Sequence, residues 1–328
     1  MNTRLALYEL ARRHGVPREG VAVLVREAGL EQPPASLQRG LWRGIAVLAA
    51  ALVGLGLILW LAANWDTLGR MGRFALLQSV VLVACLAAAL QPAVRAPAAL
   101  AALLGIGGLF AYFGQTYQTG ADAWQLFALW AVLSLPLCFA VRSDVLWAPW
   151  ALVAMTAIAL WTFAHTGHRW RVTPQDVGTF GIAWIAAGLL AAALCAPASR
   201  WTGAGPWAFR TAVTLAVVAV GAGALAALFR SPIAAHFWLG LGLLAAAGVV
   251  LAQRRMFDVF ALSAVALALD TLLVAGLSRL LFEGAGSDPF GRMLLVGLVA
   301  AGVLAVSVQF ILRLARSHGP ATLAEDAP

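Results

Sequence analysis

The chain has 328 residues, of which 62% are hydrophobic and 11% are charged, and all 22 basic residues are arginine. Soluble globular domains have about 45–50% apolar and about 25% charged residues, so a soluble fold of this size could not cover so much apolar surface. The net charge of +8 fits arginines that gather in the cytoplasmic loops of a membrane protein, and we expect no nucleic-acid binding.

Residues 1–43 predict a small cytoplasmic helical segment. Apolar residues recur there at helical spacing in two short series, which end at Gly15 and Gly29. The first series consists of Leu7, Leu10, Ala11 and His14, and the second, which forms an apolar face, consists of Val21, Leu24, Val25 and Ala28. Four glutamates dilute the seven arginines of this segment, so contact with the membrane domain, or with a second copy of the chain, is favoured over DNA binding.

Ten apolar stretches follow, each close to the roughly 20 residues that a membrane-spanning helix needs. They cover residues 44–63, 74–90, 96–113, 123–141, 145–164, 177–196, 211–229, 233–252, 259–278 and 293–312. Their short connections favour antiparallel neighbours. We therefore predict an all-α polytopic membrane bundle of nine or ten spanning helices over residues 44–313, with a disordered cytoplasmic tail at 314–328.

The positions of the arginines predict the orientation in the membrane. If the N-terminus is cytoplasmic, 15 of the 22 arginines fall in inner segments and 7 in outer loops, which favours a cytoplasmic location for both termini. Seven of the inner arginines belong to residues 1–43, so the later spans are only weakly oriented by this rule.

Two stretches of the chain are similar to each other. Residues 51–69 and 102–120 share five identical positions, three of them glycine. Glycine pairs such as Gly54 with Gly56, and Gly105 with Gly107, allow the backbones of membrane helices to approach closely. Both a chance match between glycine-rich spans and an internal repeat of the kind found in transporters are consistent with this similarity.

The same region resembles a known family. The first span closes in the motif Ala62-Ala63-Asn64-Trp65-Asp66, and a later stretch reads Gly114-Gln115-Thr116-Tyr117-Gln118 and continues to Trp130. Over about residues 1–165 the chain resembles the bacterial membrane proteins called domain of unknown function 2157. The resemblance implies a location in the bacterial inner membrane, and it implies neither an activity nor catalytic residues.

Asp270 is the most conspicuous polar residue within a span. It lies in the middle of the stretch 259–278, where a carboxylate costs a few kcal/mol unless it is protonated, paired or hydrated. Such a residue belongs either to a proton or ion pathway or to a hydrogen bond that ties two helices together, and both alternatives stay open here.

A second group of polar residues follows the first and third spans, on the predicted outer side. If these two spans are neighbours, their side chains could line one ligand pocket. The alternative is interfacial decoration, since aromatic residues favour the headgroup region and amides cap helix ends. The candidate binding residues are Asn64, Asp66, Gln115, Tyr117 and Asp122.

The sequence offers little evidence for an enzyme. It has no glycine-rich phosphate loop ending in Gly-Lys, no H-E-x-x-H and no G-x-S-x-G. His165 and His168 lack further zinc ligands nearby, so we expect no metal and no cofactor. Two functions remain: a transporter for a small solute or a proton-coupled substrate, and a non-transporting scaffold, sensor or envelope-assembly partner that acts through residues 1–43. The lipid bilayer is the expected partner of either, with a protein partner or a second copy of the chain also open.

Overall fold

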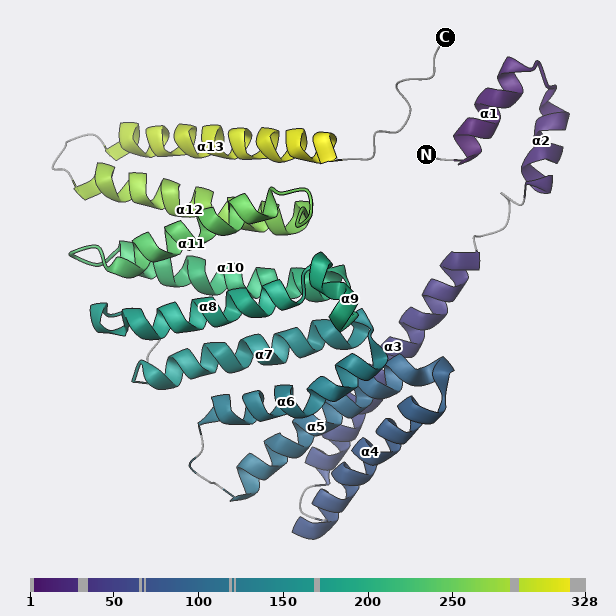
Figure 1. Ribbon diagram of the computed structural model, residues 1–328, viewed down its shortest axis with the longest axis horizontal. Helices are drawn as coiled ribbons and strands as arrows, with labels where there is room; N and C mark the ends of the chain where they lie inside the picture. Colours follow the sequence, from purple (N-terminus) through teal and green to yellow (C-terminus); the bar gives the residue numbers. More distant parts are fainter. Residues whose placement is uncertain are drawn as a thin grey trace.

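A computed structural model (Figure 1) describes residues 3–28, 35–64, 67, 69–117, 120, 122–167, 172–283 and 289–318. Every regular element in these ranges is a helix. The α-helices are α1 (Thr3–Arg13), α2 (Arg18–Glu27), α3 (Ala35–Ala63), α4 (Arg70–Leu90), α5 (Arg95–Tyr117), α6 (Ala123–Val141), α7 (Asp144–His165), α8 (Val177–Ala193), α9 (Ser199–Thr202), α10 (Pro206–Leu228), α11 (Ala235–Leu251), α12 (Val259–Glu283) and α13 (Pro289–His318). Short 3-10 helices η1 (Pro92–Val94), η2 (Pro174–Asp176) and η3 (Ala196–Ala198) lie between them.

The prediction of a polytopic helical membrane protein is confirmed. Within the described residues, nine helices are long and apolar enough to cross a membrane, and the shorter apolar helix α11 makes a tenth candidate. Each of the ten predicted spans corresponds to one of these helices. Many large apolar side chains on them face outward, as the bilayer permits because lipid is their solvent. The chain is therefore embedded in a lipid bilayer.

The two predicted N-terminal helices are present as α1 and α2. Gly15 has a positive φ of 64° in the turn between them, a conformation that glycine adopts at no steric cost. Ala11 and Val25 are buried where the helices meet. In Figure 1 this hairpin stands apart from the bundle, beyond the N-terminal end of α3.

The predicted division of the chain at residues 43 and 313 stays a prediction. Helix α3 runs without interruption from Ala35 to Ala63, and α13 runs from Pro289 to His318, so both helices continue through these positions. Residues 319–328, which make up most of the predicted tail, lie outside the described part of the chain.

Successive apolar helices run in opposite directions, so the connections alternate between two ends of the bundle (Figure 1). The Arg142 end holds the connections 91–94, 142–143, 194–205 and 252–258. The Tyr117 end holds the connections that follow α3, α5, α7, α10 and α12. Helix α3 begins and α13 ends at the Arg142 end, which is also the side of the α1–α2 hairpin in Figure 1.

Helix α10 lies at the centre of the C-terminal part, where it packs against α7, α8, α11 and α12. Helix α13 packs mainly on α12, and α3 packs mainly on α5. Both α3 and α13 keep most of their apolar surface exposed. Since α3 and α5 both end at the Tyr117 end, they are parallel neighbours, which is the arrangement that the predicted polar pocket requires.

Several helix contacts depend on glycine paired with tryptophan. The Trp130 indole of α6 covers Gly107 of α5 so closely that a Cβ built on Gly107 would lie 2.3 Å from the ring. The same indole donates a hydrogen bond of 2.8 Å from Nε1 to the carbonyl oxygen of Leu103. Trp150 of α7 repeats this bond to Ala131 of α6, also at 2.8 Å. Absence of a side chain at Gly107 thus lets an indole lie against a helix backbone and bond to it.

A network of polar bonds closes the Arg142 end. The Asp144 carboxylate accepts hydrogen bonds from the backbone N–H groups of Gly205, Trp207 and Ala208, at 2.7–3.1 Å, and thereby caps α10. Arg210, one turn further on, pairs with Asp258 at 3.0 Å. The Asp258 carboxylate also accepts from the backbone N–H of Ala261 and so caps α12. Two carboxylates therefore fix the starts of two neighbouring helices.

The two similar stretches supply a matched test of the glycine contacts. Gly107→Val should lower the free energy of unfolding by about 1–3 kcal/mol, because the new Cβ meets an indole that cannot rotate away without breaking its bond to Leu103. The matched change Gly56→Val should have little effect, since a Cβ there meets nothing within 4 Å. Unfolding of the detergent-solubilised protein by sodium dodecyl sulfate measures both. Equal losses would show that the Gly107 contact is not specific.

Candidate functional site

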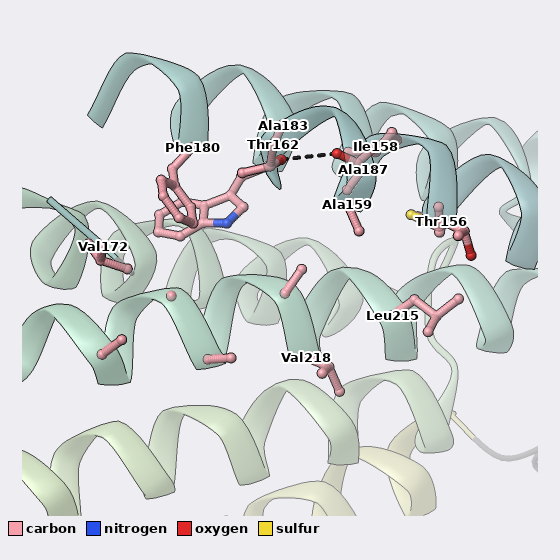
Figure 2. Close-up of a pocket in the computed structure, with 16 residues that line it drawn as sticks. Thr156, Ile158, Ala159, Thr162, Val172, Phe180, Ala183, Ala187, Leu215 and Val218 are labelled. Carbon is pink, nitrogen blue, oxygen red and sulfur yellow. Dashed lines mark hydrogen bonds between the residues drawn. The ribbon is translucent and has the colours of Figure 1, made fainter. Parts of the chain in front are cut away.

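A cavity of about 400 Å³ lies between α7, α8 and α10, and Figure 2 shows it closely. We call it the α7–α8–α10 cavity. It is lined by Met155, Thr156, Ile158, Ala159 and Thr162 of α7, by Val172, by Phe180, Ala183, Trp184 and Ala187 of α8, and by Leu215, Val218, Ala219, Ala222, Gly223 and Ala226 of α10. The volume lies within the range of about 300–1,000 Å³ that is usual for small-molecule sites.

The lining of this cavity offers almost no polar group to a ligand. Its two hydroxyl groups already donate within their own helix. Thr156 Oγ1 donates to the carbonyl oxygen of Leu152 at 2.8 Å, and Thr162 Oγ1 donates to that of Ile158 at 3.0 Å (Figure 2). The remaining wall consists mainly of aliphatic and aromatic side chains. The cavity therefore suits an apolar guest and is unsuited to a charged or strongly polar one.

A second cavity, of about 310 Å³, lies between α8, α10 and α11. We call it the α8–α10–α11 cavity. It too is apolar, and it is lined by Trp184, Gly188, Ala191 and Ala192 of α8, by Phe209, Val213, Ala216, Val217 and Val220 of α10, by Leu243, Leu244, Ala246, Ala247, Val250 and Leu251 of α11, and by Met256 and Val265. Trp184 is the one residue that belongs to the linings of both cavities.

Two glycines hold the indole of Trp184 in place. A Cβ built on Gly223 of α10 would lie 2.7 Å from the ring, and one built on Gly240 of α11 would lie 3.6 Å from it. Trp184 is itself only 4% exposed. The indole thus reaches from α8 to both α10 and α11, and a larger residue at Gly223 would displace it, whereas a Cβ at Gly240 would only touch it.

His236, in the first turn of α11, packs against the same aromatic residues. It is completely buried, and neither of its ring nitrogens has a hydrogen-bond partner among the described residues. Its ring meets Phe180 edge-on, with the centroids 5.1 Å apart, and lies 6.3 Å from the ring of Trp184. No motif in the sequence marks this histidine, because its burial depends on Phe180 and Trp184, which lie more than 50 residues earlier in the chain.

Asp270 lies in α12 and faces α13. It is 9% exposed, and its Oδ1 accepts a hydrogen bond of 2.9 Å from Ser307 Oγ. Its Oδ2 is buried without a hydrogen-bond partner in the described chain. Asp270 lines neither of the two cavities described above. The geometry matches a polar tie between two helices, and the role of Asp270 in a proton or ion pathway stays a prediction.

Four of the five residues predicted to line a polar pocket lie within the described ranges, at the Tyr117 end. The Asn64 amide donates to the carbonyl oxygen of Trp60 in its own helix, and the side chain of Gln115 is exposed. The ring of Tyr117 packs at a tilt of 41° against that of Phe113, with the centroids 4.8 Å apart. Asp122 stands at the N-cap position of α6 without a side-chain capping bond. Asp66 lies outside the described residues.

Tyr117 does line a third cavity, which lies between α4 and α5. This space has a volume of about 410 Å³, and its lining residues are Met71, Phe74, Ala75, Gln78, Leu109, Phe110, Phe113 and Tyr117. None of Asn64, Gln115 or Asp122 belongs to this lining. The role of the predicted residues as a binding site remains a prediction.

The described residues contain no group of three or more His, Cys, Asp or Glu side chains that could hold a metal ion. His165 stacks on Trp161, with ring centroids 4.4 Å apart, and its Nδ1 lies 2.9 Å from the Trp161 carbonyl oxygen. Its sequence partner His168 lies outside the described ranges.

Comparison with known proteins identifies one family. Residues 8–147 match the family described as "Predicted membrane protein (DUF2157)", which confirms the resemblance indicated by the motifs around Asn64, Gln115 and Trp130. No curated protein and no solved structure matches the chain. The matched range ends in the first turn of α7, so every residue that lines the α7–α8–α10 cavity lies beyond it.

The contact between Asp270 and Ser307 can be tested with a matched serine. Ser307→Ala should lower the free energy of unfolding by about 0.5–1.5 kcal/mol, because it leaves both carboxyl oxygens of Asp270 without a partner among the described residues. Ser79→Ala should change it less, since Ser79 Oγ donates only to Ala75 in its own helix and is exposed. Unfolding in detergent measures both variants. An effect of Ser79→Ala as large as that of Ser307→Ala would contradict a tie between α12 and α13.

Proposed function

We propose that this membrane protein is transporter-like and that it takes a small apolar molecule from the bilayer into the α7–α8–α10 cavity. One observation carries the proposal: a space of about 400 Å³ lies among membrane-spanning helices, and its wall is apolar except for the indole N–H of Trp184 and two threonine hydroxyls that already donate to their own helix. Small residues such as Ala219, Ala222 and Gly223 keep it open. The cavity is open to the outside of the bundle, because Val218 is 60% exposed and Ala219 and Ala222 are exposed, so a molecule dissolved in the lipid can reach it.

The proposal differs from a proton-coupled carrier of a polar solute. Such a carrier needs polar groups that face its substrate path, and Asp270 contributes to neither of the two cavities in the C-terminal part.

We further propose that the chain resides in the bacterial inner membrane with the Arg142 end in the cytoplasm, in keeping with the arginine distribution. The proposal assigns no enzymatic activity to the chain, since its sequence lacks the catalytic motifs considered above.

A hydrophobic photoactivatable probe tests this site. A small aryl diazirine, added to the full-length protein in lipid nanodiscs, should label peptides from α7, α8 and α10 that line the cavity. Ala222→Phe should reduce that labelling by about tenfold, because the new ring fills the space. The matched change Ala245→Phe, at an exposed position of α11 that lines neither of the two C-terminal cavities, should leave it unchanged. Labelling of the cavity peptides that is insensitive to Ala222→Phe would reject the site.

The scaffold function keeps one observation in its favour. The α1–α2 hairpin stands apart from the bundle (Figure 1) and exposes large apolar side chains, with Leu10 63% and Val23 59% exposed. Exposed apolar residues that are rimmed by charges are typical of surfaces that bind another protein. A protein partner, or a second copy of the chain, would bury these residues.

Site-specific crosslinking in cells distinguishes this function from the first. With p-benzoylphenylalanine in place of Leu10 or Val23, a protein partner should yield one discrete crosslinked species. The same substitution at Leu298 of α13, which is 71% exposed on the bundle itself, serves as the control and should yield no such species. If the hairpin positions and Leu298 behave alike, the hairpin is not a specific docking surface.

A further inference from the structure

The two C-terminal cavities are staggered along the same helices. The α7–α8–α10 cavity uses Phe180 to Ala187 of α8 and lies nearer the Tyr117 end, and the α8–α10–α11 cavity uses Trp184 to Ala192 and lies nearer the Arg142 end. On α10 their linings alternate, so they meet two different faces of that helix. They come together only at Trp184, which is their common wall.

The shape and chemistry of this pair of cavities restrict the guest. Apart from the indole N–H of Trp184, neither lining presents an unused hydroxyl donor, amide or charged side chain, so a guest gains little there from hydrogen-bonding groups. At membrane depth the two linings extend along α10 from Leu215 to Ala226 and from Phe209 to Val220. Apolar spaces with such linings fit a flexible aliphatic chain better than a rigid polar molecule. Such a chain is present in every bilayer, either as part of a phospholipid or as a free fatty acid.

We propose that the α7–α8–α10 cavity binds an aliphatic chain and that Trp184 sets the greatest chain length which it accepts. The proposal rests on the proposed function and specifies its substrate class. A chain that enters from the Tyr117 side ends against the indole of Trp184, which Gly223 and Gly240 hold between α10 and α11. Removal of the indole joins the first cavity to the α8–α10–α11 cavity, and the combined space accepts a longer chain.

The test compares chains of two lengths on the full-length protein in nanodiscs. Decanoic and hexadecanoic acids that carry a diazirine near the methyl end are the probes, and the labelled residues are identified by mass spectrometry. In the wild-type protein the shorter probe should label the α7–α8–α10 cavity and the longer one should label it weakly. Trp184→Ala should raise labelling by the longer probe relative to the shorter by about tenfold. The labelled residues should then include the wall of the α8–α10–α11 cavity, such as Val213 and Leu244.

Two further variants make the result decisive. Trp184→Phe keeps an aromatic ring in the contact with Gly223, so it should fold and should shift the preference in the same direction by a smaller factor. Trp238→Ala removes a tryptophan that is 61% exposed on α11 and lines neither C-terminal cavity, so it should leave the preference unchanged.

A parallel experiment uses a phospholipid that carries the same diazirine chain. Of the phospholipid and the free fatty acid, the probe that labels the cavity more strongly identifies the source of the chain.

The outcomes separate the two proposals. If the wild-type cavity is labelled but neither Trp184→Ala nor Trp184→Phe changes the preference for chain length, the assignment of Trp184 is wrong and the proposed function stands. If chains of either length and from either source fail to label the cavity, while the small aryl diazirine does label it, the aliphatic substrate class is wrong. If the aryl diazirine also fails, the proposed function itself is wrong.

Discussion

Helices inside a bilayer cannot be held together by the removal of apolar surface from water, because the surrounding lipid is as apolar as their side chains. Their association depends instead on close van der Waals contact and on hydrogen bonds between helices. The contact between α5 and α6 combines both, since Gly107 allows the Trp130 indole to lie against the backbone and its Nε1 bonds to Leu103. Trp150 makes the equivalent bond between α7 and α6. Such contacts explain how a chain with so few charges forms a defined bundle.

The ends of the helices follow a different rule, because they leave backbone groups unpaired. At the Arg142 end, Asp144 satisfies three backbone N–H groups of the start of α10, and Asp258 does the same for one at the start of α12 while it pairs with Arg210. At the Tyr117 end, Arg279 bonds to the carbonyl oxygen of Arg230 at 2.6 Å and pairs with Glu283. These charged residues thus have a structural explanation and are not evidence of catalysis.

Small residues have opposite consequences in the two halves of the bundle. In the N-terminal half, the Trp130 indole fills the space beside Gly107. In the C-terminal half, Ala219, Ala222 and Ala226 of α10 face space that no side chain fills, while Gly223 accepts Trp184. The family match covers residues 8–147, and the α7–α8–α10 and α8–α10–α11 cavities lie beyond it. The feature that best supports a function therefore lies outside the range in which the relationship to other proteins is established.

The sequence by itself determined that the chain is a helical membrane protein, because a span of about 20 apolar residues is a local property that can be counted along the chain. It also identified Asp270 as exceptional, since a carboxyl group in such a span is costly wherever the helix lies. The partner of Asp270 is Ser307, 37 residues later, and Asp144 caps a helix that begins more than 60 residues after it. Only the tertiary structure decides these pairings, because they depend on which helices are neighbours. The cavities belong to the same class of property: alanine and glycine occur in every span, and packing alone determines which of them face another side chain and which face empty space.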